Sequence, residues 1–465
     1  MPLKSVHITN YYHKHSGGIS TSFNNLLAAA ERNERYVRLI VPGEKEEVED
    51  INPFAKIYYV PAKYSPLFDK RYRIMMPWQY MLKDTIIRKI LLEERPDMIE
   101  VTDKYTLSLI GPMIRTNNFK KIGRPMLVHF SCERMDDNIG SFLTTNRLGK
   151  WFARRVIGNY TTPNFDYHIA NSTYTAEEFY DALAPEKNQS RSNAFLNWSW
   201  RFFKAPRVSL SERISVCPRG VDSIHFTPDR MSDEVRSDML KRSGIPEDAV
   251  ILLYAGRLSP EKNIGLLVDL MKILSADGDQ DYRLLVAGDG PTSDWLKQQG
   301  EKYAFGKLIQ LGHLEKETLA NYYANADVFV HPNPKEPFGI APLEAMASGV
   351  ATVAPNAGGI LSYATNENAW LVEPAGEQFA GAIREVVENV PLRESKIAKA
   401  LETARANTRE ASTNRLFATY DRIYEDFQLR KELFTDIEKA KEFDFVKELL
   451  SVANAGSNEI EDGIS

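Results

Sequence analysis

Two glutamates, Glu336 and Glu344, stand eight positions apart in a stretch of mostly small residues, 334–358. The apolar run 326–331 predicts a buried strand, and residues 341–348 predict the start of a helix. The first glutamate would then lie on the strand-to-helix loop and the second on the helix. Backbone N–H groups at a helix N-terminus favour oxygen-rich ligands, and carboxylates accept hydrogen bonds from hydroxyl groups. The stretch predicts a site for a sugar-bearing ligand, and the alternative is two solvated surface charges.

A basic pair, Arg257 and Lys262, follows a second predicted strand, which ends at Ala255, and precedes the helix predicted over 264–274. Arginine presents a rigid fork of donors to phosphate oxygens, and lysine presents a compact positive charge. The pair could therefore hold both phosphates of a nucleotide diphosphate. A surface salt-bridge role is the alternative interpretation.

Strands alternate with helices over residues 249–388, which predicts a βαβ domain with a parallel sheet. Ligands of such sheets lie beyond the carboxyl ends of the strands. Arg257, Gly288, His313 and Glu336 all follow predicted strands. Their common position predicts that they share one site.

The first half of the chain shows the same alternation. Residues 5–9 predict a strand, Gly17 and Gly18 a turn, and residues 19–30 a helix, a corner at which backbone can approach a phosphate. The dinucleotide fingerprint Gly-x-Gly-x-x-Gly is missing there, so a dehydrogenase is not indicated. Another apolar strand ends at His129. The acidic run 44–50 predicts a solvated loop.

The bulk composition narrows the class of protein. A chain of 465 residues predicts two domains, and a net charge of −5 argues against general nucleic-acid binding. Cys132 and Cys217 are too few for a metal cluster or a disulfide framework. The N-terminus lacks the apolar core of a signal peptide, and no uninterrupted apolar run is long enough to span a bilayer. A cytoplasmic protein is expected, peripheral on the inner membrane face if it contacts lipid.

These motifs, in this order, resemble the family-4 retaining glycosyltransferases (glycosyl transferases group 1) over residues 3–425. The resemblance implies an α/β GT-B fold, in which two Rossmann-like βαβ domains face a central cleft and a C-terminal helix crosses back to the first domain. The expected parts are an acceptor-binding domain over 1–228, a nucleotide-sugar-binding domain over 229–410, a crossover helix over 411–430, and an amphipathic tail over 431–465 that ends in disorder.

The resemblance also implies an activity, the transfer of a hexose-type sugar from a UDP- or GDP-sugar with retention of the anomeric configuration. The acceptor would be a glycan, a lipid-linked sugar or a small molecule, in polysaccharide or glycolipid biosynthesis. No cofactor and no metal is expected, because the family needs no metal-chelating Asp-x-Asp and the departing phosphate is thought to take the acceptor's proton. Homo-oligomerisation is left open.

The family's pattern also implies roles for individual residues. Arg257 and Lys262 would stabilise the leaving diphosphate, Glu336 would orient the donor sugar, and His129 would contact it near the reacting carbon. The implied donor-binding residues are Gly17, Gly18, Gly288, Gly290, His313, Phe338, Gly339, Ile340 and Glu344, the last on the ribose hydroxyls.

The sequence departs from the family at Arg219, where asparagine is usual, and over residues 130–134. Two alternatives therefore stay open: a nucleotide-sugar 2-epimerase of the same fold, or a GT-B binding protein without catalysis. Residues 193–207 combine two tryptophans and three phenylalanines with basic side chains. They predict either an apolar cap packed on its own domain, the preferred interpretation, or a peripheral membrane contact.

Overall fold

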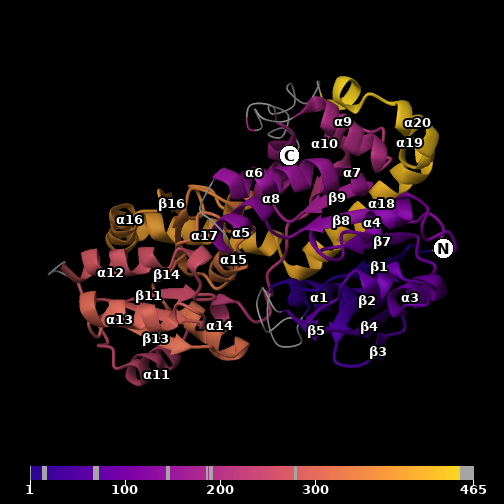
Figure 1. Cartoon of the computed structure of the whole chain (residues 1–465). Helices are drawn as coiled ribbons and strands as arrows, with labels where there is room; N and C mark the ends of the chain where they lie inside the picture. The colour runs from indigo at the N-terminus through magenta and orange to yellow at the C-terminus, as the bar shows by residue number, and fades with distance from the viewer. Residues whose placement is uncertain are drawn as a thin grey trace. The chain divides into compact units, whose positions relative to one another are not determined.

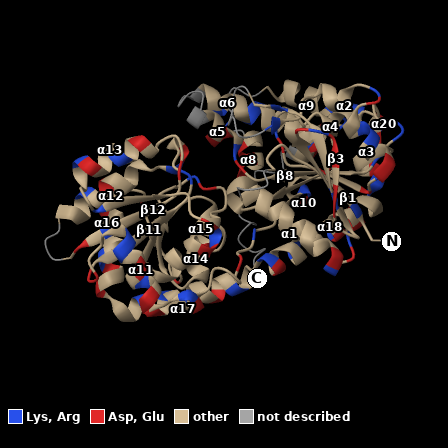
Figure 2. Ribbon diagram, turned by 90° about the horizontal axis from the view of Figure 1, so that it is seen from below, with Lys and Arg blue, Asp and Glu red and all other residues tan. Residues whose placement is uncertain are grey.

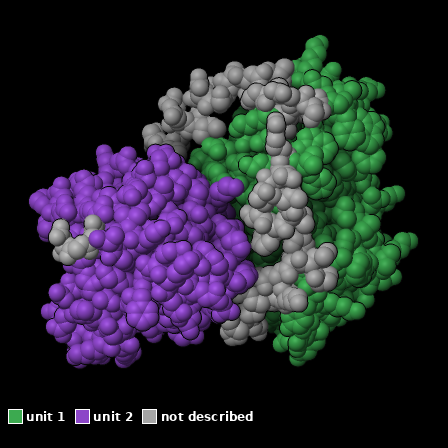
Figure 3. Space-filling view, turned by 60° about the vertical axis from the view of Figure 1, so that its left-hand side comes forward, with its two compact units in different colours: residues 1–217, 413–465 green, residues 218–412 purple. Residues whose placement is uncertain are grey.

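The computed structural model describes residues 2–12, 18–65, 73–142, 147–184, 187, 192–276 and 280–450. The chain forms two compact units (Figure 3): unit 1 comprises Met1–Cys217 and Thr413–Ser465, and unit 2 comprises Pro218–Ser412. The predicted domain boundaries, after residues 228 and 410, lie close to these. Residues 218–228 belong to unit 2 because Val221 forms a bridge with Thr408 and donates its N–H to the Asn407 carbonyl, at 2.8 Å.

Unit 1 is built on an eight-stranded sheet with the order β10-β9-β8-β7-β1-β2-β4-β3 among the described residues (Figure 1). All neighbours are parallel except β3 and β4. The strands are β1 (Lys4–Ile8), β2 (Tyr36–Gly43), β3 (Glu47–Asn52), β4 (Ala55–Pro61), β7 (Met98–Val101), β8 (Met126–Ser131), β9 (Tyr167–Ala170) and β10 (Ile214–Val216), with a separate ribbon of β5 (Lys63–Tyr64) and β6 (Arg73–Ile74).

The helices of unit 1 connect and flank these strands. They are α1 (Gly18–Arg32), α2 (Trp78–Met81), α3 (Ile86–Glu94), α4 (Ile110–Arg115), α5 (Met135–Phe142), α6 (Arg147–Val156), η1 (Ile157–Thr161), α7 (Thr162–Asn164), α8 (Thr173–Leu183), α9 (Asn193–Phe202), α10 (Leu210–Arg213), α19 (Lys431–Thr435), α20 (Ile437–Glu442) and η5 (Val446–Leu450). The strand and the helix predicted at the N-terminus are therefore present as β1 and α1, and residues 13–17 between them lie outside the described residues.

The prediction of a solvated loop over the acidic run 44–50 was wrong in part. Residues from Glu47 onward form the exposed edge strand β3, which pairs antiparallel with β4. Glu49 accepts a hydrogen bond from the Tyr59 hydroxyl at 2.7 Å, and Lys56 pairs with Asp50 at 2.9 Å. Charged side chains suit an edge strand, because they oppose pairing with another chain.

Unit 2 has a six-stranded, all-parallel sheet with the order β13-β12-β11-β14-β15-β16 among the described residues (Figure 1). The strands are β11 (Val250–Ala255), β12 (Tyr282–Ala287), β13 (Leu308–Gly312), β14 (Val328–Val330), β15 (Ala351–Pro355) and β16 (Trp370–Val372). Every residue of the central strands β11 and β14 is buried, as expected where helices cover both faces. The predicted βαβ domain is therefore present.

The helices of unit 2 alternate with its strands. They are η2 (Pro228–Arg230), α11 (Asp233–Ser243), η3 (Pro260–Lys262), α12 (Gly265–Ala276), α13 (Ser293–Tyr303), α14 (Lys316–Asn325), α15 (Ile340–Ala347), η4 (Gly359–Ser362), α16 (Gly376–Glu388) and α17 (Val390–Ala406).

The helix α18 (Arg409–Leu429) begins in unit 2 and belongs to unit 1 from Thr413 onward. In unit 1 its apolar side chains, Phe417, Tyr420, Ile423 and Phe427, join the core cluster that contains residues of β2, β4 and β8. The Tyr420 hydroxyl donates to Glu100 at 2.5 Å. The predicted return of a C-terminal helix to the first domain is confirmed.

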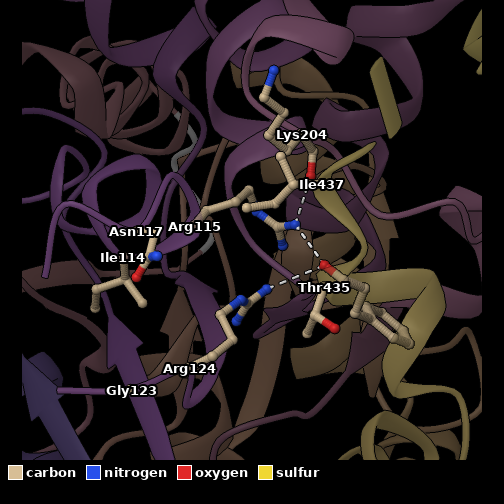
Figure 4. Close-up of a pocket in the computed structure, with 9 residues that line it drawn as sticks. Ile114, Arg115, Asn117, Gly123, Arg124, Lys204, Thr435 and Ile437 are labelled. Atoms are coloured by element: carbon tan, nitrogen blue, oxygen red, sulfur yellow. Dashed lines mark hydrogen bonds between the residues drawn. The ribbon is translucent and has the colours of Figure 1, made fainter. Parts of the chain in front are cut away.

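The tail after α18 packs on unit 1 as far as Leu449. Phe434 joins the same core cluster as α18, and Ala440 and Phe445 join another. Arg115 donates to the Phe434 carbonyl at 3.0 Å, and Arg124 donates to it at 3.4 Å, beside a pocket of about 290 Å³ (Figure 4). Residues 451–465, for which disorder was predicted, lie outside the described residues.

Candidate functional site

The candidate site of unit 2 lies at the carboxyl ends of four neighbouring strands. β11, β12, β13 and β14 are parallel, so the loops that follow them emerge at one edge of the sheet. Arg257, Gly288, His313 and Glu336 stand on these loops. The shared edge that the sequence predicted for these residues is therefore present.

The loops after β11 and β12 touch each other through glycines. A Cβ atom on Gly288 would lie 1.8 Å from the Gly256 carbonyl oxygen, and one on Gly290 would lie 2.1 Å from the Leu258 oxygen. Gly288 also donates its N–H to the Gly312 carbonyl at 2.8 Å. These glycines are needed for the close approach of backbone to backbone. Their contact with a ligand stays a prediction.

Lys262 and Glu336 form an ion pair at this edge, with 2.7 Å between Nζ and Oε2. The same carboxylate oxygen accepts a hydrogen bond from the Asn333 amide at 3.0 Å, and Asn263 donates to the Pro332 carbonyl at 2.9 Å. The loop after β11 is thus tied to the loop after β14. The sequence placed Lys262 and Glu336 in one site, and the structure brings them into direct contact.

The pKa values of Glu336 and its neighbour His331 are both lowered. Burial alone would raise the pKa of Glu336, but Lys262, His331 and the Asn333 hydrogen bond outweigh it and lower the pKa to about 2. Burial lowers the pKa of His331 to about 4, against the attraction of Glu336. His331 Nε2 lies 4.0 Å from Glu336 Oε2 and has no hydrogen-bond partner within the described part of the chain. Near pH 7 Glu336 is therefore an ionised carboxylate and His331 a neutral imidazole.

Glu344 lies on α15 in a different environment. Burial raises its pKa to about 7, and the Tyr323 hydroxyl donates a hydrogen bond to it at 3.3 Å, which lowers the pKa. Arg409 and Lys316 also lower it, without offsetting the burial. A carboxyl group with this pKa is ready to lose its proton when a ligand donates hydrogen bonds to it.

The loop before α15 presents backbone donors. Gly339 has φ +86° and is followed directly by the first turn of the helix, whose N–H groups have no intrahelical acceptor. Among the described residues, the N–H groups of Phe338, Gly339 and Ile340 have no hydrogen-bond acceptor. The Phe338 ring is buried against Tyr363, with 5.2 Å between ring centroids, and the Tyr363 hydroxyl donates to the Gly339 carbonyl. This fixed turn can donate hydrogen bonds to an oxygen-rich ligand.

The loop after β15 packs directly against this turn. A Cβ atom on Gly359 would lie 2.0 Å from the Pro337 carbonyl oxygen, and Gly359 donates its N–H to the Glu336 carbonyl at 2.7 Å. Arg257 and His313, in contrast, are exposed at the ends of β11 and β13. The Tyr254 hydroxyl donates to the Arg257 carbonyl at 3.0 Å. The site thus combines rigid loops with exposed cationic and imidazole side chains.

The structure speaks against His129 as a donor contact. Its side chain, in unit 1, is 0% exposed, and its ring lies 5.3 Å from Phe165, 5.6 Å from His168 and 5.8 Å from Phe179. Burial lowers its pKa well below the usual range. The histidine ends its strand as predicted, but the strand turns this side chain into the core. Gly18 begins α1, and Gly17 lies outside the described residues.

Arg134, the last of the residues 130–134 that depart from the family's pattern, belongs to a network of charges in unit 1. Arg134 pairs with Asp136 at 3.0 Å and with Asp181 at 2.9 Å. Lys104 and Glu178 form a buried ion pair nearby at 2.5 Å. The sequence could not find this network, because its members come from distant parts of the chain and no local pattern joins them.

His331 and Asn333 were not among the predicted site residues. The sequence held one signal for them, since His331 ends a predicted strand and Asn333 follows it, before Glu336. Among the described residues no group of three His, Cys, Asp or Glu side chains is placed to hold a metal ion. The expectation that no metal is required stays a prediction. No helix of the described chain is both long and apolar enough to cross a bilayer.

The chain is similar to known glycosyltransferases. Residues 235–403 match the family described as glycosyl transferases group 1. Over 387 residues the chain is 28% identical to the GDP-mannose-dependent alpha-(1-6)-phosphatidylinositol dimannoside mannosyltransferase of Mycobacterium tuberculosis, covering 83% of this chain and 88% of that protein. It is 25% identical to a GDP-mannose-dependent alpha-mannosyltransferase of Corynebacterium glutamicum, covering 77% of this chain and 73% of the relative.

Solved structures agree on the fold. Sucrose-phosphate synthase from Thermosynechococcus elongatus superposes with a TM-score of 0.67 at 18% identity, covering 91% of this chain and 100% of that one. Anabaena HepE in complex with UDP and glucose superposes with a TM-score of 0.62 at 16% identity, covering 90% and 99%. Residues 235–403 thus belong to the glycosyl transferases group 1, and the chain is a glycosyltransferase with the GT-B fold.

Proposed function

We propose that this enzyme transfers mannose from GDP-mannose to a lipid-linked acceptor and retains the anomeric configuration. The Lys262–Glu336 pair is the observation that carries the proposal. It places a cation and an ionised carboxylate side by side at the carboxyl ends of the strands, just before α15. A nucleotide-diphosphate sugar offers phosphate oxygens to the cation and hydroxyl groups to the carboxylate. The choice of GDP-mannose and of a lipid acceptor rests on the names of the two relatives.

The proposed mechanism is a displacement at the anomeric carbon. The bond from this carbon to the diphosphate oxygen breaks, a bond to the acceptor oxygen forms on the same face, and the departing phosphate takes the acceptor's proton. Negative charge grows on the leaving phosphate, and Arg257 and Lys262 stabilise it there. Glu336 orients the sugar through its hydroxyl groups, and Glu344 accepts hydrogen bonds from the ribose. No protein general base and no metal takes part in this scheme.

The first test identifies the donor nucleotide from its effect on thermal unfolding. The protein is heated with GDP, UDP or ADP and with the matching nucleotide sugars, all at the same concentration. A ligand present at about 100 times its dissociation constant adds about 2.7 kcal/mol to stability, and a weaker ligand adds less. We expect the guanosine compounds to raise the unfolding temperature most, and Glu344→Ala to reduce the effect. A larger shift with UDP or ADP would contradict the proposed donor, and no shift with any nucleotide would contradict the enzyme as proposed.

The raised pKa of Glu344 predicts that GDP-mannose affinity depends on pH. Two ribose hydroxyls donate to the ionised form, so binding must release the proton that Glu344 holds below its pKa of about 7. Affinity should therefore rise as pH increases from about 5.5 to 8, by up to about tenfold for each pH unit below the pKa. Calorimetric titration of wild type measures this, and Glu344→Gln should bind weakly with a flat profile. An equal slope in the variant would remove Glu344 from the ribose site.

Two alternatives predict different products. A nucleotide-sugar 2-epimerase would convert GDP-mannose alone into a new nucleotide sugar, whereas a transferase needs an acceptor. A non-catalytic binding protein would bind nucleotide but release no GDP. Incubation of GDP-mannose with and without a phosphatidylinositol mannoside, followed by analysis of both products, separates the three. Acceptor-dependent release of GDP together with a mannosylated lipid is the expected result.

A further inference from the structure

The outer face of α9 carries three aromatic rings in a row. Phe195, Trp198 and Phe202 are 52%, 56% and 55% exposed. Their spacing places them on one side of the helix, and neighbouring ring centroids lie 5.5 Å and 5.4 Å apart in stacked geometry. The prediction of an apolar cap over 193–207 is therefore only half right. The rings of this row face outward.

The inner face of α9 is firmly packed, so its orientation is set. Leu196 and Trp200 are buried in one core cluster, and the Trp200 indole donates to the Gly158 carbonyl at 2.9 Å. The C-terminal tail holds the helix from the other end. Arg201 donates to the Phe443 carbonyl at 2.8 Å, and Asn197 donates to Asp444 at 3.0 Å. The stacked row cannot turn inward without breaking these contacts.

A second outward row lies on α6. Leu148, Trp151 and Phe152 are exposed, while Ala153 is buried in the same core cluster as Leu196 and Trp200 of α9. Both helices also contact η1, and they lie along the same side of unit 1 (Figure 1 and Figure 2). Six large apolar side chains therefore face outward from two helices that share one core. Several large apolar side chains exposed on one side of a unit indicate an interaction surface.

The charges of the two helices select the partner. The sequence of α6, Arg-Leu-Gly-Lys-Trp-Phe-Ala-Arg-Arg-Val, has basic residues and no acidic one. That of α9 has Arg201 and likewise no acidic residue. The whole chain, in contrast, carries a net charge of −5. Helices that carry aromatic rings and cations but no acidic residue of their own suit the interface of a bilayer with anionic headgroups, where rings enter the headgroup region and cations meet phosphates.

We propose that the outer faces of α6 and α9 form a docking surface for an anionic lipid bilayer. The rings of α9 and α6 insert at the level of the headgroups, and Lys150 and Arg155 of α6 bind lipid phosphates. The tail as far as Phe445 holds α9 so that its aromatic row faces outward. Fixing this orientation would be the role of the chain that follows α18. Docking needs neither donor nor acceptor sugar, so its test is independent of the proposed transfer reaction.

Vesicle flotation tests the surface with three variants of the full chain. The aromatic variant is Phe195→Ser/Trp198→Ser/Phe202→Ser, and the charge variant is Lys150→Glu/Arg155→Glu. The control, Trp295→Ser/Phe305→Ser, removes exposed aromatic rings from unit 2 instead. Vesicles contain phosphatidylcholine mixed with phosphatidylglycerol, or phosphatidylcholine alone. Unchanged unfolding temperatures and unchanged nucleotide-induced shifts will show that each variant is folded.

Wild type and the control should float with the mixed vesicles and bind phosphatidylcholine alone less. The aromatic variant should lose at least about tenfold in partitioning to both. The charge variant should lose its preference for phosphatidylglycerol, and high salt should weaken binding of the wild type because it screens the cations. Flotation of the aromatic variant at the wild-type level would overturn the proposal. A dimer seen in sedimentation and lost in that variant, without flotation of the wild type, would assign the face to a second copy instead.

Discussion

Lys262→Met should reduce kcat/KM for sugar transfer by about 10²–10³, the usual loss when one preorganised donor to a developing oxyanion is removed. In the structure Lys262 lies 2.7 Å from Glu336 and is partly shielded from solvent, with its side chain 26% exposed. Its charge is therefore in position before the donor arrives. Most of the loss should appear in kcat, because the leaving diphosphate gains charge as the bond to the sugar breaks.

The same ion pair makes Glu336 dependent on Lys262. Burial raises the pKa of Glu336, and Lys262 is the strongest of the contacts that lower it. Without Lys262 the pKa of Glu336 should therefore rise from about 2 toward its ordinary value. Glu336→Ala should also lower transfer by at least about tenfold, and the double variant should lose less than the product of the two single losses, as groups in contact do. Steady-state and single-turnover rates of the three variants measure this coupling.

Lys297→Met is a matched control for Lys262→Met. Lys297 is an exposed lysine of α13 in the same unit, on a helix and outside the loops that carry the predicted site residues. Its loss should leave kcat/KM within about twofold, as surface substitutions usually do. Near-normal turnover in both Lys262→Met and Glu336→Ala, with the fold intact, would refute the assigned site.

Gly290→Ala should markedly destabilise unit 2, although Gly290 does not have a positive φ. The added Cβ would lie 2.1 Å from the Leu258 carbonyl oxygen and 2.9 Å from its nitrogen. Backbone atoms cannot rotate away as a side chain can, so the loop after β11 or β12 must move. Overpacking of this kind costs about 1–3 kcal/mol, and we expect the upper end of that range.

The measurement is the unfolding temperature of unit 2, which should fall by about 2–4 °C for each kcal/mol lost. Binding of GDP should weaken as well, because the displaced loops carry Arg257 and Lys262. Gly381→Ala is the control: Gly381 lies inside α16, and a Cβ atom added there would meet no atom within 4 Å among the described residues. Alanine there should stabilise the helix by up to about 1 kcal/mol. An equally stable Gly290→Ala would show that the two loops do not need their close approach.

The sequence predicted the strand edge of unit 2 because its signals are local. Continuous apolar runs such as 250–255 indicate strands buried on both faces, and glycines after them indicate tight turns. Parallel strands then bring residues from distant loops to one edge, which is why Lys262 and Glu336 could be assigned together. That α18 returns to unit 1 could be predicted only from the family's pattern. The apolar side chains of the helix show that one face is buried, but they do not show which domain that face packs on.

The sequence alone determined the α/β class, the βαβ alternation and the motif residues of unit 2, because each depends on neighbours within a few positions. Only the tertiary structure decided which side chains face inward. His129 and Trp198 each stand within two positions of another aromatic residue in the sequence, yet one ring is enclosed and the other is exposed. The pKa of about 7 at Glu344 likewise arises from burial by distant segments. Burial is a sum over the whole fold, so no local pattern contains it.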